Sequence, residues 1–313
     1  MKKYFQTLLT ATMLLTMVAC SQMEDLHPGG NNGKAEQVSF AITTGQVQGR
    51  TAGDGNTVDQ VHYEVWDKIT GELVVSSITR KNGGEPLVMK EGRASVYLEL
   101  VRGVPYDITF WAHNEQGTAY DIDNGLQYVT VKSEIMANRE TYDAFYQTLT
   151  DYLIGKGTTK VVLKRPFAQV NVGTALADWQ KAQDLQVQID HSTVTVSGIA
   201  NVFDARTGKA SGNASLTYEL GKVLTETFEV EGNAYRYLGM NYMLADSEKT
   251  LHSLSITLYD GDKKVNTLNV NNMPIKRNWK TNIVGNLLTI KEDFKILIEP
   301  GFTNDNNGPF EYK

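Results

Sequence analysis

Residues that could carry chemistry are few, and their spacing matches no common catalytic motif. The chain has five histidines, each isolated in the sequence: His27, His62, His113, His191 and His252. There is no HExxH segment and only one cysteine, so a zinc site is not expected. No serine lies in a GxSxG elbow, and the GKGTTK segment lacks the spacing of a phosphate-binding loop. We therefore predict that the protein is not an enzyme and that it needs no metal or cofactor.

Two polar segments could still contact a ligand. In AYDIDNG, Asp121 and Asp123 could begin a calcium loop, but the further ligands and the bidentate acid are missing at the required offset. An Asx turn explains this cluster more simply. Trp179 lies in the polar segment LADWQKAQD and is the one tryptophan that we consider for stacking on a sugar. The other three lie in strand patterns and are expected in the core: Trp66, Trp111 and Trp279.

The single cysteine, Cys20, follows a segment with the features of an export signal. Lys2 and Lys3 form a positive start, an apolar run follows, and Ala19 directly precedes the cysteine. This arrangement resembles bacterial lipoprotein signals, which implies cleavage after Ala19 and lipid attached to Cys20, with the domain held on a membrane. The alternative is a chance cysteine in an ordinary signal peptide. Charge fits an exterior protein: −6 for the whole chain becomes −8 when the two lysines leave, which argues against a nucleic-acid partner.

The rest of the chain has the pattern of an all-β protein. Alternation in VSFAITT predicts a strand over Val38 to Thr44, with Val38, Phe40 and Ile42 on its buried face. A glycine-rich loop follows over Gly45 to Gly55, and then a long series of short alternating segments separated by turn signals. One of these signals, Asp260-Gly261, predicts a tight hairpin. The last clear strand is FKILIEP, Phe294 to Pro300. Apolar residues at spacings of three and four make Ser133 to Leu153 the main candidate for a helix.

These segments predict two tandem antiparallel β-sandwich domains with a short helical insertion. We assign residues 1–20 to the signal peptide and lipidated cysteine, and residues 21–36 to a flexible tether. The N-terminal domain is then 37–164 and the C-terminal domain 165–313.

Several motifs together resemble the fimbrillins of Bacteroidales, the type V pilins and their tip and anchor relatives. They are, in order, the lipoprotein signal at Cys20, the strand VSFAITT followed by GRTAG, the midpoint segment LKRPFAQVNVG, and KRNWKTNIVGNLLTI at Lys276 to Ile290. The resemblance implies domains of transthyretin-like, Greek-key type and a structural or adhesive pilus subunit at the outer-membrane surface or in the pilus. The partners it implies are other fimbrial subunits, a trypsin-like maturation protease, and a membrane reached through the lipid.

In this family the first strand is removed and replaced, so the resemblance implies a cut between Arg50 and Thr51. The released strand would carry Val38, Phe40 and Ile42, and a strand from another subunit would fill its groove. Alternatively, Arg50 is an ordinary loop arginine and the strand never leaves. FKILIEP could be a donor strand or simply the last strand of the second domain. The rival functions are a non-polymerising surface lipoprotein that binds glycan or host protein, and, less in keeping with the missing motifs, a β-sandwich enzyme.

Overall fold

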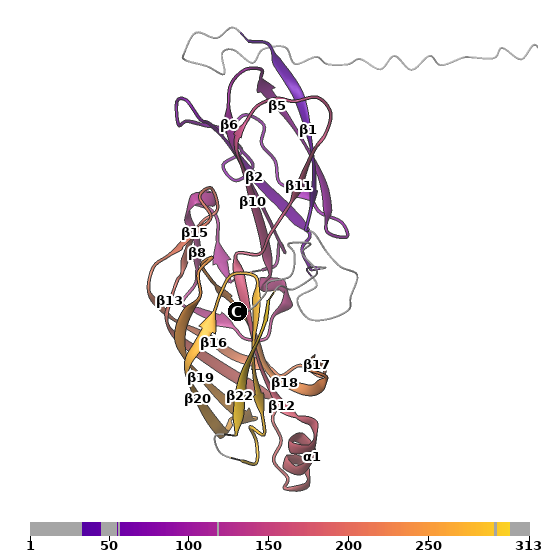
Figure 1. Ribbon diagram of the computed structural model, residues 1–313, viewed down its shortest axis with the longest axis vertical. Coiled ribbons are helices and arrows are strands. Elements are labelled where there is room, and N and C mark those ends of the chain that lie inside the picture. The colour runs from indigo at the N-terminus through magenta and orange to yellow at the C-terminus, as the bar shows by residue number, and fades with distance from the viewer. Residues whose placement is uncertain (1–32, 45–54, 56, 118, 291–292, 301–313) are drawn as a thin grey trace, which may run out of the picture. The chain divides into compact units, whose positions relative to one another are not determined.

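The protein is almost entirely β-structure. A computed structural model describes residues 33–44, 55, 57–117, 119–290 and 293–300 (Figure 1). The only α-helix in these ranges is α1, Leu176–Asp184. No helix among the described residues has the length and apolar character needed to cross a membrane.

Two sheets form the first sandwich. The three-stranded sheet has the order β11-β1-β5, with these bounds: β1 Ala35–Thr43, β5 Arg93–Val101 and β11 Thr159–Val162. The facing sheet has the order β10-β6-β2-β3, with β4 also paired to β2: β2 Gln60–Asp67, β3 Leu73–Ser76, β4 Leu87–Val88, β6 Tyr106–His113 and β10 Ala144–Tyr152. The strand predicted over Val38 to Thr44 is confirmed as β1.

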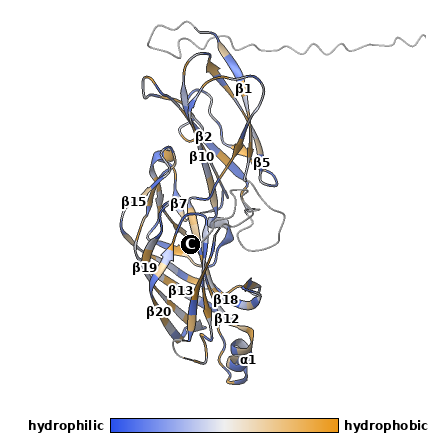
Figure 2. Ribbon diagram, viewed as in Figure 1, coloured by the Kyte–Doolittle hydropathy of each residue, from blue (hydrophilic) through white to orange (hydrophobic). Residues whose placement is uncertain are grey.

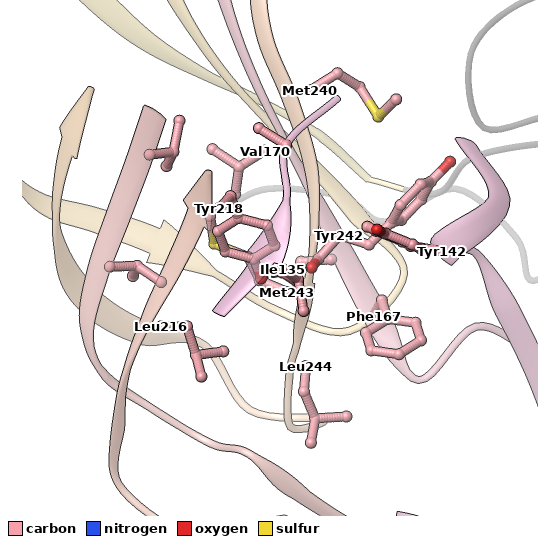
Figure 3. Packing of buried hydrophobic residues seen from close by; sticks show 14 of the residues in the cluster. Ile135, Tyr142, Phe167, Val170, Leu216, Tyr218, Met240, Tyr242, Met243 and Leu244 are labelled. Atoms are coloured by element: carbon pink, nitrogen blue, oxygen red, sulfur yellow. Dashed lines mark hydrogen bonds between the residues drawn. The ribbon is translucent and has the colours of Figure 1, made fainter. Parts of the chain in front are cut away.

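Two five-stranded sheets form the second sandwich. One has the order β17-β18-β12-β21-β22: β12 Phe167–Ala175, β17 Thr227–Val230, β18 Asn233–Leu244, β21 Trp279–Gly285 and β22 Phe294–Pro300. The other has the order β20-β19-β13-β16-β9: β9 Glu134–Met136, β13 His191–Ile199, β16 Ala214–Lys222, β19 Thr250–Asp260 and β20 Lys263–Ile275. Both sheets contribute to one buried cluster that includes Ile135, Tyr218 and Met243 (Figure 3).

A small four-stranded sheet joins segments that are distant in the sequence. Its order is β15-β14-β8-β7: β7 Tyr120–Asp121, β8 Val129–Val131, β14 Val202–Asp204 and β15 Lys209–Ser211. Residues 120–136 therefore pair with strands from the second half of the chain, through β8 with β14 and through β9 with β16. Orange and blue residues both occur along the strands in Figure 2, as expected for strands with one face toward a core.

The helix predicted over Ser133 to Leu153 is wrong. This segment contains β9, the 3₁₀ helix η2 (Glu140–Tyr142) and β10, and a second 3₁₀ helix, η1, covers Leu126–Tyr128. β10 pairs with β6 along most of its length, so sheet pairing overrides the loose helical spacing of the apolar residues. The short helical insertion exists, but it is α1, in the polar segment that follows β12.

Two local predictions are confirmed. The Asp121 carboxylate accepts a hydrogen bond from the Asp123 backbone N–H at 2.7 Å, which is the Asx turn expected there. After Asp260, the two residues Gly261 and Asp262 connect β19 to β20 in the tight hairpin predicted there, and Gly261 has a φ of 55°, a conformation that favours glycine.

The Asn138 side chain ties the two sheets of the second sandwich together. Its Nδ2 donates to Ser192 Oγ at 3.2 Å and to the carbonyl oxygens of Gly221 and Lys222 at 3.0 Å each. Its Oδ1 accepts from the backbone N–H of Met240 at 2.8 Å. One buried amide thus bonds to β13 and β16 in one sheet and to β18 in the other.

A buried ion pair joins Asp143, which directly precedes β10, to Arg165, which follows β11. Arg165 Nε lies 2.9 Å from Asp143 Oδ1 and Arg165 Nη2 lies 2.8 Å from Oδ2, with both side chains almost fully buried. The guanidinium also stacks on the Phe145 ring, 4.5 Å from its centroid. Another ion pair joins Arg206, in the β14–β15 turn, to Asp107 on β6, with Arg206 Nη2 3.0 Å from Asp107 Oδ2.

We predict that Asp143→Asn strongly destabilises the protein, because it removes the negative charge from the buried side chain that the Arg165 guanidinium contacts. Breaking a buried pair from one side costs about 3–5 kcal/mol. Chemical denaturation monitored by circular dichroism measures the change. Glu36→Gln, which removes the exposed pair between Glu36 and Arg102, is the control and should leave the midpoint unchanged. Equal midpoints for Asp143→Asn and the parent protein would contradict the prediction.

Two buried histidines face each other on the side of β2 and β6 that carries Trp111, opposite the side on which Phe110 meets Phe40. The rings of His62 on β2 and His113 on β6 have centroids 5.1 Å apart, and both side chains are buried. Burial lowers the pKa of His62 to about 3, with help from the nearby His113, and it lowers the pKa of His113 to about 4. Both rings are therefore neutral at physiological pH.

We predict that the free energy of unfolding falls as the pH drops below about 6.5. In this range the two histidines bind protons in the unfolded state but stay neutral in the folded state. Each histidine contributes at most about 1.4 kcal/mol per pH unit, down to its folded pKa. Melting temperatures between pH 7.5 and 4.5 test this, with His62→Gln/His113→Gln as the comparison. The double variant should show a shallower fall, and an identical slope would contradict the prediction. Buried Glu64, whose pKa is raised by burial, acts in the opposite direction but is present in both proteins.

Candidate functional site

The candidate site is the groove that β1 fills. β1 is the middle strand of its sheet and runs antiparallel to β5, from Ala35 opposite Val101 to Thr43 opposite Arg93. Its second half, Phe40 to Thr43, also pairs in parallel with β11. β5 and β11 do not pair with each other, so β1 alone joins them within the described residues.

One face of β1 is part of the core. Val38, Phe40 and Ile42 are 6%, 0% and 2% exposed. The Phe40 ring lies 5.5 Å from the Phe110 ring on β6 and 5.2 Å from the Tyr152 ring on β10, measured between centroids. These contacts reach across to the facing sheet, so β1 closes the sandwich from one side.

Polar contacts hold both ends of β1. Near its start, Arg102 donates to Glu36 through Nε at 2.7 Å and through Nη2 at 2.6 Å. The hydrogen bond from Arg102 lowers the pKa of the Glu36 carboxyl, so the pair stays charged. Near its end, the Thr44 N–H donates to the Gly92 carbonyl at 3.0 Å. The Glu36–Arg102 pair is exposed and adds little stability, so the buried side chains mainly hold β1 in the groove.

The lining of the groove suits the binding of a strand. Apolar side chains from both sheets line it, and the β1 backbone supplies hydrogen bonds on both sides. Across the described part of the chain, no group of three or more His, Asp or Glu side chains is placed to hold a metal ion. The arrangement can accept an extended strand with apolar residues at alternate positions.

The remaining predicted site residues fall into two groups. Ala19, Cys20, Arg50 and Thr51 lie outside the described residues, so cleavage and lipidation stay predictions. Thr44 and Thr57 are the nearest residues with described backbone structure on either side of the 45–54 segment, apart from Gly55.

Trp179 lies on α1 and is half-buried against the core of the second sandwich. The Arg236 guanidinium lies over its ring, 4.3 Å from the centroid. A cation–π contact therefore already uses one face of the indole. Glycan contact at Trp179 stays a prediction from the sequence.

The sequence did not point to a second feature, an open cavity of about 490 Å³ beside β9 and η2. Its lining includes Lys132, Glu134, Met136, Arg139 and Tyr142. Arg139 Nε points at the Met136 sulfur from 3.2 Å, so this cation is directed along the rim. No motif marks these residues, because an irregular stretch between β8 and β10 brings them together.

Comparison with solved structures finds proteins of similar architecture at low sequence identity. A candidate adhesin from Bacteroides thetaiotaomicron has 13% identity and a TM-score of 0.48, over 88% of this chain and 98% of that one. A C-terminally truncated tip fimbrial protein from Porphyromonas gingivalis has 9% identity and a TM-score of 0.47, over 84% and 99%. The fimbrial anchor protein of the same organism has 13% identity and a TM-score of 0.43, over 86% and 98%. The last two have fimbrial names, the class that the sequence motifs resemble.

Sequence comparison places the chain in a family. No curated protein matches it. A family profile does match, and it covers residues 32–312, which include both sandwiches. The chain therefore belongs to the Family of unknown function (DUF6562).

Proposed function

We propose that this protein is a cell-surface lipoprotein of fimbrillin type, a structural or adhesive subunit that accepts a strand from another subunit in place of β1. Cys20 would carry the lipid, and a trypsin-like protease would cut between Arg50 and Thr51. The partner would be another fimbrial subunit. The protein would be located at the outer-membrane surface or in the pilus.

The position of β1 carries this proposal. β1 is the first of the described strands, lies in the middle of its sheet, and buries one face in the core. Because all other described strands follow β1 in the sequence, one cut in the segment after it would separate this core strand from them. The arginine of the predicted cut, Arg50, is in that segment.

The energetics favour replacement over an empty groove. Each of Val38, Phe40 and Ile42 contributes about 1.5–3 kcal/mol when buried. Together they approach the whole stability of a typical domain, about 5–15 kcal/mol. Loss of β1 also leaves two unpaired strand edges, on β5 and β11, in one sheet. A groove of this kind is stable only when another strand occupies it.

β22 is engaged within this chain, which argues against a role as the donor. It pairs with β21 over its full length, and its side chains pack against the second sandwich. The chain is therefore better suited to accept a strand than to give one, which favours a role at an end of a filament.

We predict that low-dose trypsin cuts the purified protein after Arg50 and gives a new N-terminus at Thr51. The cut fragment should stay bound, because its apolar face is in the core, and should exchange for an added strand from another subunit. N-terminal sequencing and a mild gel measure the two steps. Arg50→Gln is the control and should keep the chain intact. A cleaved protein that never exchanges its fragment would rule out assembly through this groove.

We predict that Phe40→Ala weakens the hold on β1 by about 3–5 kcal/mol, the usual cost of a buried phenylalanine. After cleavage, the fragment should dissociate much faster than the parent fragment, as followed by size-exclusion chromatography. Tyr97→Ala is the matched control, since Tyr97 lies on β5 opposite Ser39 but is 61% exposed. Equal release rates for the two variants would show that the Phe40 contacts do not hold the strand.

A further inference from the structure

The outer edge of β22 has no partner among the described strands. β22 is the last strand of its sheet and pairs with β21 only, from Phe294 opposite Gly285 to Pro300 opposite Trp279. All seven residue pairs are in register without a bulge. An edge of this length and regularity presents unpaired N–H and C=O groups to any strand of suitable sequence.

The other long edge of this sandwich is protected, which makes β22 distinctive. β20 has two register shifts against β19, and Asn272 within it has a φ of 56°. It also begins with Lys263 and Lys264. Bulges and lysines are common ways to prevent edge-to-edge pairing. β22 has no bulge, and its middle residues, Ile296 to Ile298, are all apolar.

The backbone pattern shows which β22 residues face outward. The Asn286 N–H donates to the Asp293 carbonyl at 2.9 Å, which sets the alternation of the β21–β22 ladder. In this ladder Lys295, Leu297 and Glu299 direct their backbone groups at β21. Phe294, Ile296 and Ile298 then direct theirs away from it.

Packing holds this edge in place. Phe294 and Ile296 contact the large core cluster from one face of the strand, and Leu297 contacts the small cluster of Val230, Tyr235 and Val284 from the other. A strand anchored on both faces is already extended, so it loses little conformational entropy when it pairs.

We propose that β22 pairs with β22 of a second copy of this chain, antiparallel and centred on Leu297. In this register Ile296 faces Ile298 of the second copy, and these are the residues whose N–H and C=O groups have no partner among the described strands. Lys295 faces Glu299 of the second copy, and the twofold symmetry repeats the pair. Pro300 lacks an N–H and falls at the end of the ladder, where only one hydrogen bond is lost.

Two independent requirements select this register. Hydrogen-bond alternation requires outward-facing residues to lie opposite one another, and a centre at Leu297 satisfies it. Charge requires Lys295 to meet an acid, and the same centre places Glu299 there. Glu299 Oε2 also accepts a hydrogen bond from Asn282 Nδ2 of the neighbouring strand β21 at 3.1 Å. The order of lysine and glutamate in FKILIEP is therefore complementary to itself, which favours a second copy over an unrelated strand.

This pairing is separate from the β1 groove and needs no cleavage. The experiment uses the mature chain from residue 20 with Cys20→Ser, in which every described residue is kept, and with Arg50 uncut. Sedimentation velocity over a range of concentrations should show a monomer–dimer equilibrium. In the dimer, hydrogen–deuterium exchange should slow at the amides of Ile296 and Ile298 as concentration rises.

The decisive variant is Lys295→Glu, which places a second carboxylate opposite Glu299 at both symmetry-related positions of the dimer. The dissociation constant should rise about tenfold or more. Because Lys295 also contacts Glu231 at 3.2 Å, Lys295→Glu/Glu231→Lys restores that contact within the subunit and should dimerise no better. Lys295→Arg keeps the charge and should dimerise like the parent. Melting temperatures confirm that each variant is folded.

Three outcomes would overturn the proposal. One is a chain that stays monomeric at every concentration. Another is a dimer that Lys295→Glu does not weaken. The third is protection of the Ile296 and Ile298 amides at all concentrations in a monomer, which would assign the edge to residues 301–313 of the same chain. None of these results bears on strand exchange at β1.

Discussion

The apolar face of β1 is the contact on which the first sandwich depends. Phe40 packs on rings from β6 and β10, and so joins the first described strand to strands that follow much later in the sequence. The same strand is the only link between β5 and β11 among the described strands. Among the described residues, only the C-terminal end of β1 is connected through the chain to further strands of the sandwich. Its removal would therefore require cleavage of one peptide bond after β1 and the free energy that separates the strand from its groove.

The rest of the protein is joined by buried polar groups of a different kind. Asn138 satisfies its amide with bonds to both sheets of the second sandwich, and Arg165 and Asp143 neutralise each other inside the protein. Such groups are costly to bury without their partners, so they favour one arrangement of the chain. The polar contact at the start of β1, between Glu36 and Arg102, is exposed and contributes little. These buried polar contacts therefore lie away from β1. The side-chain contacts that retain β1 in its sheet are mainly apolar.

Two sheet positions could serve association, and they differ in what they require. The β1 groove is closed in this structure, and a partner can enter only if a strand leaves. The β22 edge is open within the described residues, and a partner can add to it without any rearrangement. A subunit with both could form filaments through one and lateral contacts through the other. The physical difference is that exchange replaces a core, whereas addition extends a sheet.

Local alternation in the sequence was enough to predict the all-β class, the strand at β1 and its three buried residues, because a strand with one buried face has a period of two. Turn chemistry likewise identified the Asx turn at Asp121 and the hairpin at Asp260-Gly261. The helix predicted over Ser133 to Leu153 failed, since pairing of β10 with β6 decided that segment and pairing is not local. Tertiary structure alone showed that β1 lies between β5 and β11, that Arg165 meets Asp143, and that β22 has an open edge among the described strands. Each of these depends on which distant segments lie side by side, and single-sequence periodicity contains no information about neighbours.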